Sequence, residues 1–236
     1  MEKLQLIVPD SLNEITLGQY QDYLKAIDGL DEEQHAEIIN KRLIEAVCGI
    51  EYKYVDTIPM RDIESVLKVL TEAFSKEYDL QKKFKLLDVE MGFIPKLDDI
   101  SLGEFIDAEN TITDWQQIHK AMAVLYRPVN FTKGERYDIV PYEPSEEVQM
   151  LMKEMPLDVV MGCLVFFYRL GMELSTATLN SIQSLLKTAK KDTMSHLEEA
   201  LEQNGVGINQ FMLSPKEMSE DLTKLRSLNS TSVLPS

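Results

Sequence analysis

Apolar residues recur at the 3.6-residue period of an amphipathic helix along most of the chain. Two stretches show the period well, residues 31–48 and residues 59–77. In the first stretch the apolar face consists of Ala36, Ile39, Leu43 and Val47. In the second it consists of Ile63, Val66, Leu67, Leu70 and Phe74. Such a stripe indicates a helix that buries one side against a core.

Polar residues that accept from free backbone amides mark where helices begin. Thr16 is followed three residues later by Gln19, and Ser101 by Glu104, which is the capping-box arrangement. Thr113 and Ser214 begin similar sequences, and Pro59 and Pro156 precede acidic first turns. These signals predict helices over residues 16–28, 31–48, 59–77, 101–110, 113–126, 145–154, 156–171, 176–203 and 214–227.

Strand signals are few. Val129–Tyr142 alternates around Lys133 and Gly134, which predicts a β-hairpin, and Leu4–Val8 predicts a short strand. Gly and Pro number only 10 and 9, fewer than the many turns of a sandwich or barrel require. We therefore predict a mainly α fold, with one or more multi-helix domains, a short β-hairpin and an extended C-terminal arm. Any sheet should be confined to the two strand segments.

The predicted domain organisation has three parts. These are an N-terminal helical subdomain at residues 1–95, a second helical subdomain at 96–203 with the hairpin near 129–142, and a C-terminal arm at 204–236.

One sequence pattern occurs twice in the chain. Leu12–Asp22 and Leu97–Asp107 match at an offset of 85 residues, and each has an apolar residue before the helix cap and an aromatic residue at the fourth helical position. Either the chain has arrived twice at a favourable helix start, or a helical unit is duplicated and each copy opens a subdomain. Two copies are too few for a solenoid.

The C-terminal segment has apolar residues but little to bury them against. Val206–Leu213 is apolar without a clear period, and a helix that begins at Ser214 is expected to carry Met218, Leu222 and Leu225 on one face. A helix of about 14 residues is marginal alone. We predict that residues 204–236 dock on another subunit or partner; the alternative is that they fold back on their own domain.

The chain is acidic, with a net charge of −16, and residues 1–180 carry 33 of the 40 acidic and 18 of the 24 basic side chains. A phosphate-binding surface needs clustered Lys and Arg. Pairs such as Lys82–Lys83 and Lys190–Lys191 are instead typical of solvated helix faces. We expect no direct sequence-specific binding to nucleic acid; a basic partner, or tolerance of a DNA-lined space by repulsion, fits the charge better.

The cysteines and the most apolar segment bear on compartment. Cys48 and Cys163 lie in apolar settings, which favours buried thiols over a disulfide and hence a reducing compartment. After Met1 no basic segment precedes an apolar one, so no signal peptide is expected. Val159–Tyr168 is too short for a bilayer, which takes about 20 residues, so it predicts a buried core helix and no transmembrane segment.

No motif typical of a catalytic or metal centre is present in the sequence. His35, His119 and His196 are isolated from one another and from both cysteines, and HExxH, CxxC, glycine-rich phosphate-loop and GxSxG patterns are missing. We therefore predict no catalytic, cofactor-binding or metal-binding residues and no cofactor. An enzyme with an unfamiliar site is the third interpretation of function, after a structural component and an assembly chaperone or adaptor.

The most distinctive segment is Asp114–Pro128. Its apolar residues predict one helical stripe that buries Trp115, formed by Trp115, Ile118, Met122 and either Leu125 or Tyr126. Arg127 precedes Pro128, which ends the helix. Arg127 is expected either to cap the last carbonyls or to form a structural clamp with an acid such as Asp107.

Three segments of the chain resemble virion proteins of tailed phages of Bacteroidetes hosts, including crAss-like phages. These segments are Ile15–Tyr20, Ile100–Asp107 and the run from Trp115 and His119 to Val129, and together they cover roughly a fifth of the chain. Proteins of this size in such particles are either ring subunits that join portal to tail or cargo proteins stored for ejection. A weaker likeness is to baseplate-hub and tail-assembly proteins of other tailed phages.

The resemblance implies a non-enzymatic structural component of a tailed-phage virion, made in the host cytoplasm and located at the portal–tail connector or among the ejected cargo. Its partners would be other virion proteins, such as portal, tail or ring subunits, and it would form a homo-oligomer in a symmetric assembly. The alternative is an assembly chaperone or adaptor that binds a partner protein and is absent from the mature virion.

Overall fold

A computed structural model describes residues 7–188. More than half of these residues are helical, and a small antiparallel sheet completes the fold, so the predicted mainly α class is confirmed. The arm predicted at 204–236, with its helix at 214–227, lies outside the described residues, as do residues 4–6 of the first predicted strand. The two described residues of that segment, Ile7 and Val8, are not in a strand.

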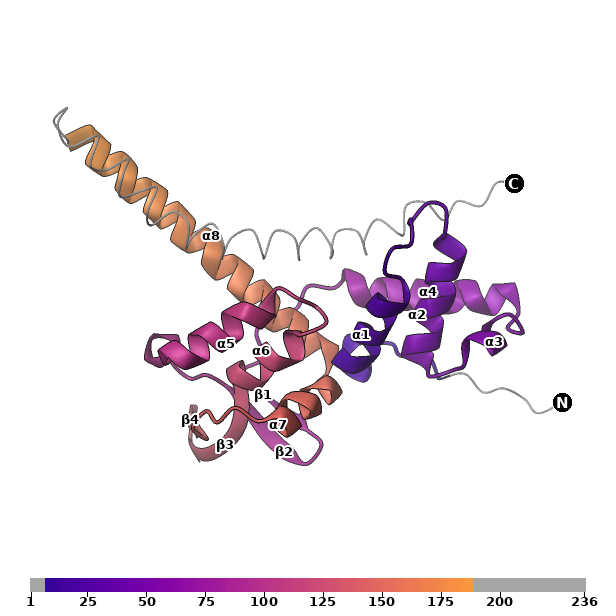
Figure 1. Cartoon of the computed structure of the whole chain (residues 1–236), viewed down its shortest axis with the longest axis horizontal. Helices are drawn as coiled ribbons and strands as arrows, with labels where there is room; N and C mark the ends of the chain where they lie inside the picture. The colour runs from indigo at the N-terminus through magenta and orange to yellow at the C-terminus, as the bar shows by residue number, and fades with distance from the viewer. Residues whose placement is uncertain (1–6, 189–236) are drawn as a thin grey trace.

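The elements follow one another as helices, a hairpin, more helices, a second hairpin and a last group of helices that ends with α8. The α-helices are α1 (Leu17–Ala26), α2 (Ala36–Cys48), α3 (Tyr52–Val55), α4 (Met60–Ser75), α5 (Leu102–Ile112), α6 (Ile118–Leu125), α7 (Glu146–Leu151) and α8 (Leu157–Thr188). The 3-10 helices are η1 (Leu12–Glu14), η2 (Leu97–Asp99) and η3 (Met152–Glu154). The strands are β1 (Lys83–Leu86), β2 (Val89–Phe93), β3 (Tyr126–Lys133) and β4 (Arg136–Ile139). Figure 1 shows α2–α4 at one end, α5, α6 and the sheet at the other, and α1 between them.

Both predicted capping boxes are present. The Thr16 hydroxyl accepts from the Gln19 backbone N–H at 3.2 Å, and the Gln19 side chain accepts from the Thr16 N–H at 2.8 Å. Ser101 and Glu104 repeat the arrangement at the start of α5. In each copy a 3-10 turn, η1 or η2, comes directly before the box. The two matching segments therefore share local structure as well as sequence.

The helix predictions differ from the structure in two places. Residues 156–171 and 176–188 belong to one helix, because α8 runs unbroken through 172–175, and residues 189–203 of the second predicted helix lie outside the described residues. Gly171 costs a helix interior only about 1 kcal/mol, and no proline interrupts it. The helix predicted at 113–126 begins instead at Ile118, since Asp114 Oδ1 accepts from the Gln116 N–H at 2.8 Å and holds a turn there.

The sheet is a meander in the order β1-β2-β3-β4. The predicted hairpin is confirmed as β3–β4, with Gly134 at φ +62° in its turn. The expectation that the sheet stops there is wrong, because β1 and β2 form a second hairpin in which Phe84 faces Met91. β2 also pairs with β3, where Gly92 faces Arg127.

One cluster of buried apolar side chains extends from Leu12 to Leu164. Tyr126 is fully buried within it, in edge contact with Phe84 and Phe93 at centroid distances of 5.3 and 5.2 Å. β2 and β3 pair across the boundary at residue 95, so both proposed subdomains contribute to this core; the boundary stays a prediction.

The apolar segment Val159–Tyr168 forms the beginning of α8, and its first six residues are buried, as predicted. None of the described helices combines the length and apolarity that a membrane crossing requires. Both cysteines are free thiols: Cys163 is buried and Cys48 is half-buried. Further along, α8 leaves the body as a long rod (Figure 1).

Close approach of the backbone fixes where α8 lies. A methyl group at Gly162 would lie 2.2 Å from the Asp79 carbonyl oxygen, which no real contact permits. We expect Gly162→Ala to lower the free energy of unfolding by about 1–3 kcal/mol in urea denaturation, because the helix must shift. Gly171→Ala is the control on the same helix. It meets nothing within 4 Å, so it should stabilise by about 0.5–1 kcal/mol. Equal effects at both positions would contradict this packing.

Candidate functional site

A buried ion pair joins α5 to β3. Arg127 Nη2 lies 2.8 Å from Glu104 Oε1, and each side chain is only 10% exposed. The other Glu104 oxygen, Oε2, accepts from the Ser101 backbone N–H at 2.7 Å. One carboxylate therefore caps a helix and holds an arginine at the same time. Because both charges are largely removed from water, each depends on the other for compensation.

The electrostatics suit a fixed clamp. Burial alone raises the pKa of Glu104, but hydrogen bonds from Ser101 and the charge of Arg127 outweigh it, so this pKa lies below its ordinary value. Beside the pair, the Tyr142 hydroxyl donates to Asp107 Oδ2 at 2.8 Å. Burial, followed by this bond, raises the pKa of Tyr142 to about 12. Neither group is tuned to exchange protons near neutral pH, as a general acid or base would be.

The clamp predicted for Arg127 is thus present, with Glu104 as the acid in place of Asp107. Sequence reasoning assigned Glu104 to the capping box alone. Glutamate is rarely buried without a partner, so a buried Glu104 would have predicted an ion pair. The sequence does not show that Glu104 is buried.

A second polar cluster ties α1 to α6. Gln21 Nε2 donates to the Trp115 carbonyl at 2.7 Å and lies 3.2 Å from His119 Nδ1. In return, Gln116 Nε2 donates to the Gln21 carbonyl at 3.0 Å. Because the Gln21 amide nitrogen donates, His119 Nδ1 accepts and the imidazole is neutral.

The setting of His119 favours that neutral form. Burial lowers the pKa of His119 first, and the positive charges of Lys153 and Lys120 lower it further. The ring is 5% exposed and contacts no nucleophile in the part of the chain that the structure describes. The cluster can therefore hold two helices together, and its chemistry offers no reaction.

Trp115 does not occupy the predicted position. It precedes α6, so it is not in one helical stripe with Ile118 and Met122, although it packs against the core as a partly buried side chain. Its ring meets Tyr20 edge-on at a centroid distance of 5.0 Å. Trp115 thus belongs to the joint between α1 and α6.

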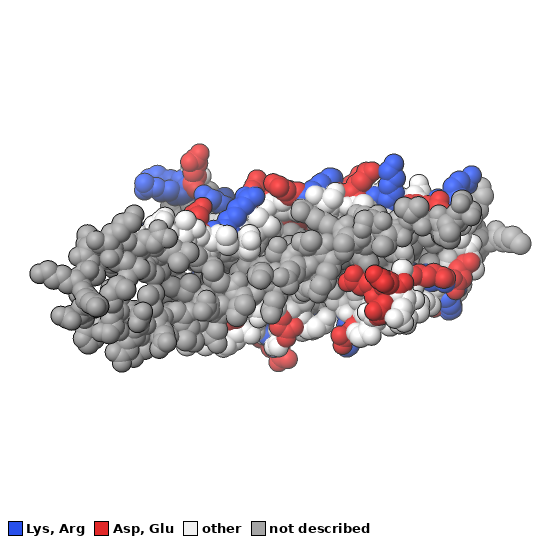
Figure 2. Space-filling view, turned by 90° about the horizontal axis from the view of Figure 1, so that it is seen from above, with Lys and Arg blue, Asp and Glu red and all other residues white. Residues whose placement is uncertain are grey.

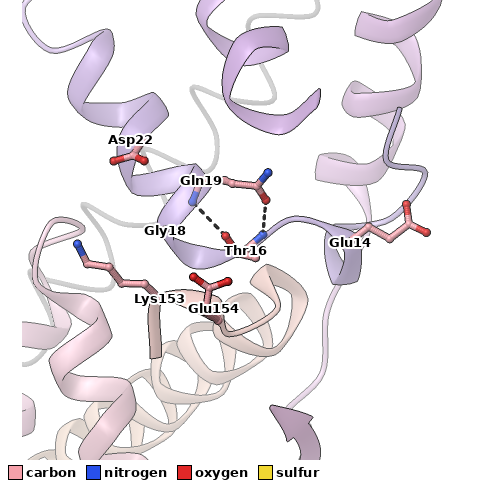
Figure 3. A pocket seen from close by; sticks show the side chains of 7 residues that line it. All are labelled: Glu14, Thr16, Gly18, Gln19, Asp22, Lys153 and Glu154. Atoms are coloured by element: carbon pink, nitrogen blue, oxygen red, sulfur yellow. Dashed lines mark hydrogen bonds between the residues drawn. The ribbon is translucent and has the colours of Figure 1, made fainter. Parts of the chain in front are cut away.

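An open depression lies where α1 begins, next to η3 (Figure 3). It is lined by Glu14, Thr16, Gly18, Gln19, Asp22, Lys153 and Glu154. Figure 3 shows the Thr16–Gln19 capping box at its centre, with Lys153 and Asp22 on one side and Glu14 on the other. The lining is polar and its carboxylates do not converge. The chain that leads into α8 forms part of its wall through Lys153 and Glu154.

Other chemistry has little support among residues 7–188. No group of three or more His, Cys, Asp or Glu side chains within that range is placed to hold a metal ion. Burial raises the pKa of the Cys163 thiol far above neutrality and that of Cys48 to about 11, so neither is an activated nucleophile.

The surface charges are mixed. On the face in Figure 2, Lys and Arg side chains alternate with Asp and Glu along one edge, and acidic side chains gather at the right-hand end. Interspersed charges of this kind are typical of a solvated surface and not of a track for phosphates.

Comparison with protein-family models, with curated proteins and with solved structures finds no match for this chain.

We expect Arg127→Ala to lower the free energy of unfolding by about 3–5 kcal/mol, because it leaves the Glu104 carboxylate buried without its countercharge. Urea denaturation at neutral pH measures the loss. Arg136→Ala, at an exposed position on β4, is the matched control and should change stability by no more than about 0.5 kcal/mol. A loss at Arg127 no larger than that at Arg136 would show that the clamp contributes nothing.

The lowered pKa of His119 predicts a pH dependence of stability. The unfolded imidazole gains a proton near pH 6.5, whereas the folded one does so only at lower pH. The stability from neutral His119 is therefore present above pH 6.5 and is lost as the pH falls below it, by at most about 1.4 kcal/mol per pH unit. His119→Gln should reduce the drop in unfolding free energy between pH 7.5 and 5.5. His35→Gln, at an exposed turn, is the control. Unchanged drops in both variants would contradict the prediction.

Proposed function

We propose that this protein is a non-enzymatic structural component that works through contacts with other protein chains, as a ring subunit at the portal–tail connector or as ejected cargo of a tailed-phage virion. The observation that carries the proposal is the projection of α8 from the body (Figure 1). The sequence resemblance supports the placement in a phage particle, and a contact role agrees with side-chain clusters that serve structure and offer no reaction.

The projecting part of α8 has little to stabilise it within the described residues. Its fully buried side chains end at Leu164, and Arg169 then reaches back to the body through Asp79 at 3.1 Å. Beyond this contact Met172 is 48% exposed. Helical stability in proteins comes mostly from the packing of an apolar face, so such a rod is expected to be covered by another chain.

Composition supports the same conclusion. The sequence from 170 to 188 contains only Glu173 and Lys187 as charged residues, although charged residues make up 27% of the chain. Solvent-exposed helix faces are normally rich in charge. A helix that projects from an acidic body and has almost no charge suits contact between subunits, where charged residues are depleted.

An assembly chaperone or adaptor is the second candidate. The exposed side chain of Met172 and the low charge of this part of α8 favour it too, because a chaperone also needs an apolar surface for a partner. The two candidates differ in whether the protein stays in the finished particle.

Mass spectrometry of purified particles of the phage that encodes this chain tests the proposal. We expect the protein at a constant molar ratio to the portal protein across density fractions, because a ring subunit or cargo protein has a defined copy number. A non-structural phage protein serves as the control for contamination. Absence from particles, with recovery on a virion protein from infected cells, would select the chaperone. Absence from both would overturn the proposal.

A further inference from the structure

The first copy of the repeated segment has a defined docking partner inside the protein. The Leu17 N–H donates to the Met155 carbonyl at 2.8 Å, and the Leu157 N–H donates to the Ile15 carbonyl at 2.9 Å. This antiparallel bridge, with Thr16 opposite Pro156, seats the chain that leads into α8. The apolar side chains on both sides of the bridge are fully buried. The start of α1 thus receives an extended segment with an apolar–Pro–apolar sequence.

The start of α1 also lines the depression of Figure 3, beside the bridge, and the second copy repeats the sequence of this lining. Five of its lining residues come from the first copy, and each has a counterpart of the same kind 85 positions later. The pairs are Glu14 and Asp99, Thr16 and Ser101, Gly18 and Gly103, Gln19 and Glu104, and Asp22 and Asp107. The second copy therefore carries the chemistry of a docking surface at the start of α5.

No described residue occupies this second surface. Leu102 is 75% exposed, whereas its counterpart Leu17 is fully buried. Phe105 and Ile106, one turn further along α5, are 39% and 44% exposed and share a helical face with Leu102. The Leu102 N–H and the Ile100 carbonyl, which correspond to the two groups of the bridge, make no backbone hydrogen bond with the residues that the structure describes.

Gly103 gives an independent reason to expect an occupant. A methyl group at Gly18 would lie 3.2 Å from both Cβ and the carbonyl oxygen of Lys153, so in the first copy a side chain at this position would crowd the segment that leads into the bridge. A methyl group at Gly103 would meet nothing within 4 Å. Glycine within a helix is destabilising relative to alanine. No contact within the described part of the chain requires glycine at Gly103. Close approach by another chain would explain why a destabilising glycine is present there.

We propose that the surface formed by Ile100, Leu102, Gly103, Phe105 and Ile106 docks an extended segment of another protein, with an apolar residue, a proline and a second apolar residue, preceded by a basic residue. Met155, Pro156 and Leu157, with Lys153 two positions before Met155, define this pattern in the first copy.

Charge supports the basic residue. In the first copy Lys153 lies at a surface that also carries Glu14 and Asp22, and in the second copy Asp99 and Asp107 take their places and are exposed. Asp99 contacts only the exposed Lys96 at 3.5 Å, and Asp107 accepts from Tyr142. The inference rests on the proposed function in one respect, because it names one surface through which that contact role is exerted.

Thermal unfolding of the full chain tests whether the surface is free. We expect Gly103→Ala to raise the midpoint, because α5 gains helix propensity and loses nothing. Gly18→Ala, the same change at the matching position, should lower the midpoint, since Lys153 must move. Leu102→Ser should leave it nearly unchanged. Losses at Gly103 and Leu102 would mean that the chain covers this surface itself and would overturn the proposal.

Fluorescence anisotropy tests the ligand. The probe is a labelled peptide of residues 152–160, Met-Lys-Glu-Met-Pro-Leu-Asp-Val-Val, and the control peptide carries Met155→Ser and Leu157→Ser. We expect saturable binding of the probe to the full chain, and affinity at least about tenfold weaker for the control peptide and for Gly103→Gln protein.

No binding of the probe, or binding that Gly103→Gln does not weaken, would overturn the proposal. Both measurements use purified protein and no particles. The docking proposal can therefore be contradicted while the protein is still found in virions. It can equally be confirmed while the protein is absent from virions.

Discussion

The antiparallel bridge between Ile15–Leu17 and Met155–Leu157 is the constraint on which the rest of the fold depends. It joins parts of the chain some 140 residues apart, and the elements from α1 to η3 have to fold within that span. Loop-closure entropy grows only with the logarithm of length, so two hydrogen bonds and four buried apolar side chains can hold so long a loop. The bridge also fixes where α8 begins, and the contact of Gly162 with Asp79 then determines the line along which the helix leaves the body.

Local chemistry made the helix starts and one hairpin predictable from the sequence. The capping boxes at Thr16 and Ser101 need only residues three apart, and the β3–β4 turn is marked by Gly134 at positive φ. The β1–β2 hairpin was missed because its turn carries Leu87 at φ +53°, a conformation for which glycine or asparagine is the usual signal. Polar and apolar residues alternate in the sequence of β1. Four residues are too short a run to predict a strand when the turn that follows lacks the usual turn residues.

The polar clusters were predictable only in part, because each needs a partner that the fold supplies. Glu104 was assigned correctly to a helix cap, yet Arg127 reaches it only because β2 and β3 bring the end of α6 beside α5. Gln21 and His119 are 98 residues apart and carry no local signal of their pairing. Both clusters compensate buried polar groups that come from elements far apart in the sequence.

The two copies of the repeated segment form the same local structure in different surroundings. Whether they arose by duplication or by repeated use of a favourable helix start, each forms a 3-10 turn, a capping box and a helix, and only the first is covered within the described residues. A body at high negative charge repels other copies of itself and other acidic chains, so the contacts that we propose require either a surface of low charge or a basic partner. The exposed apolar face of α5 and the nearly uncharged rod of α8 are such places, and they lie on elements whose positions the buried clusters fix. The Glu104–Arg127 clamp is one of these buried clusters. It holds the inner side of α5 to the sheet, and Leu102 and Phe105 are exposed on the same helix.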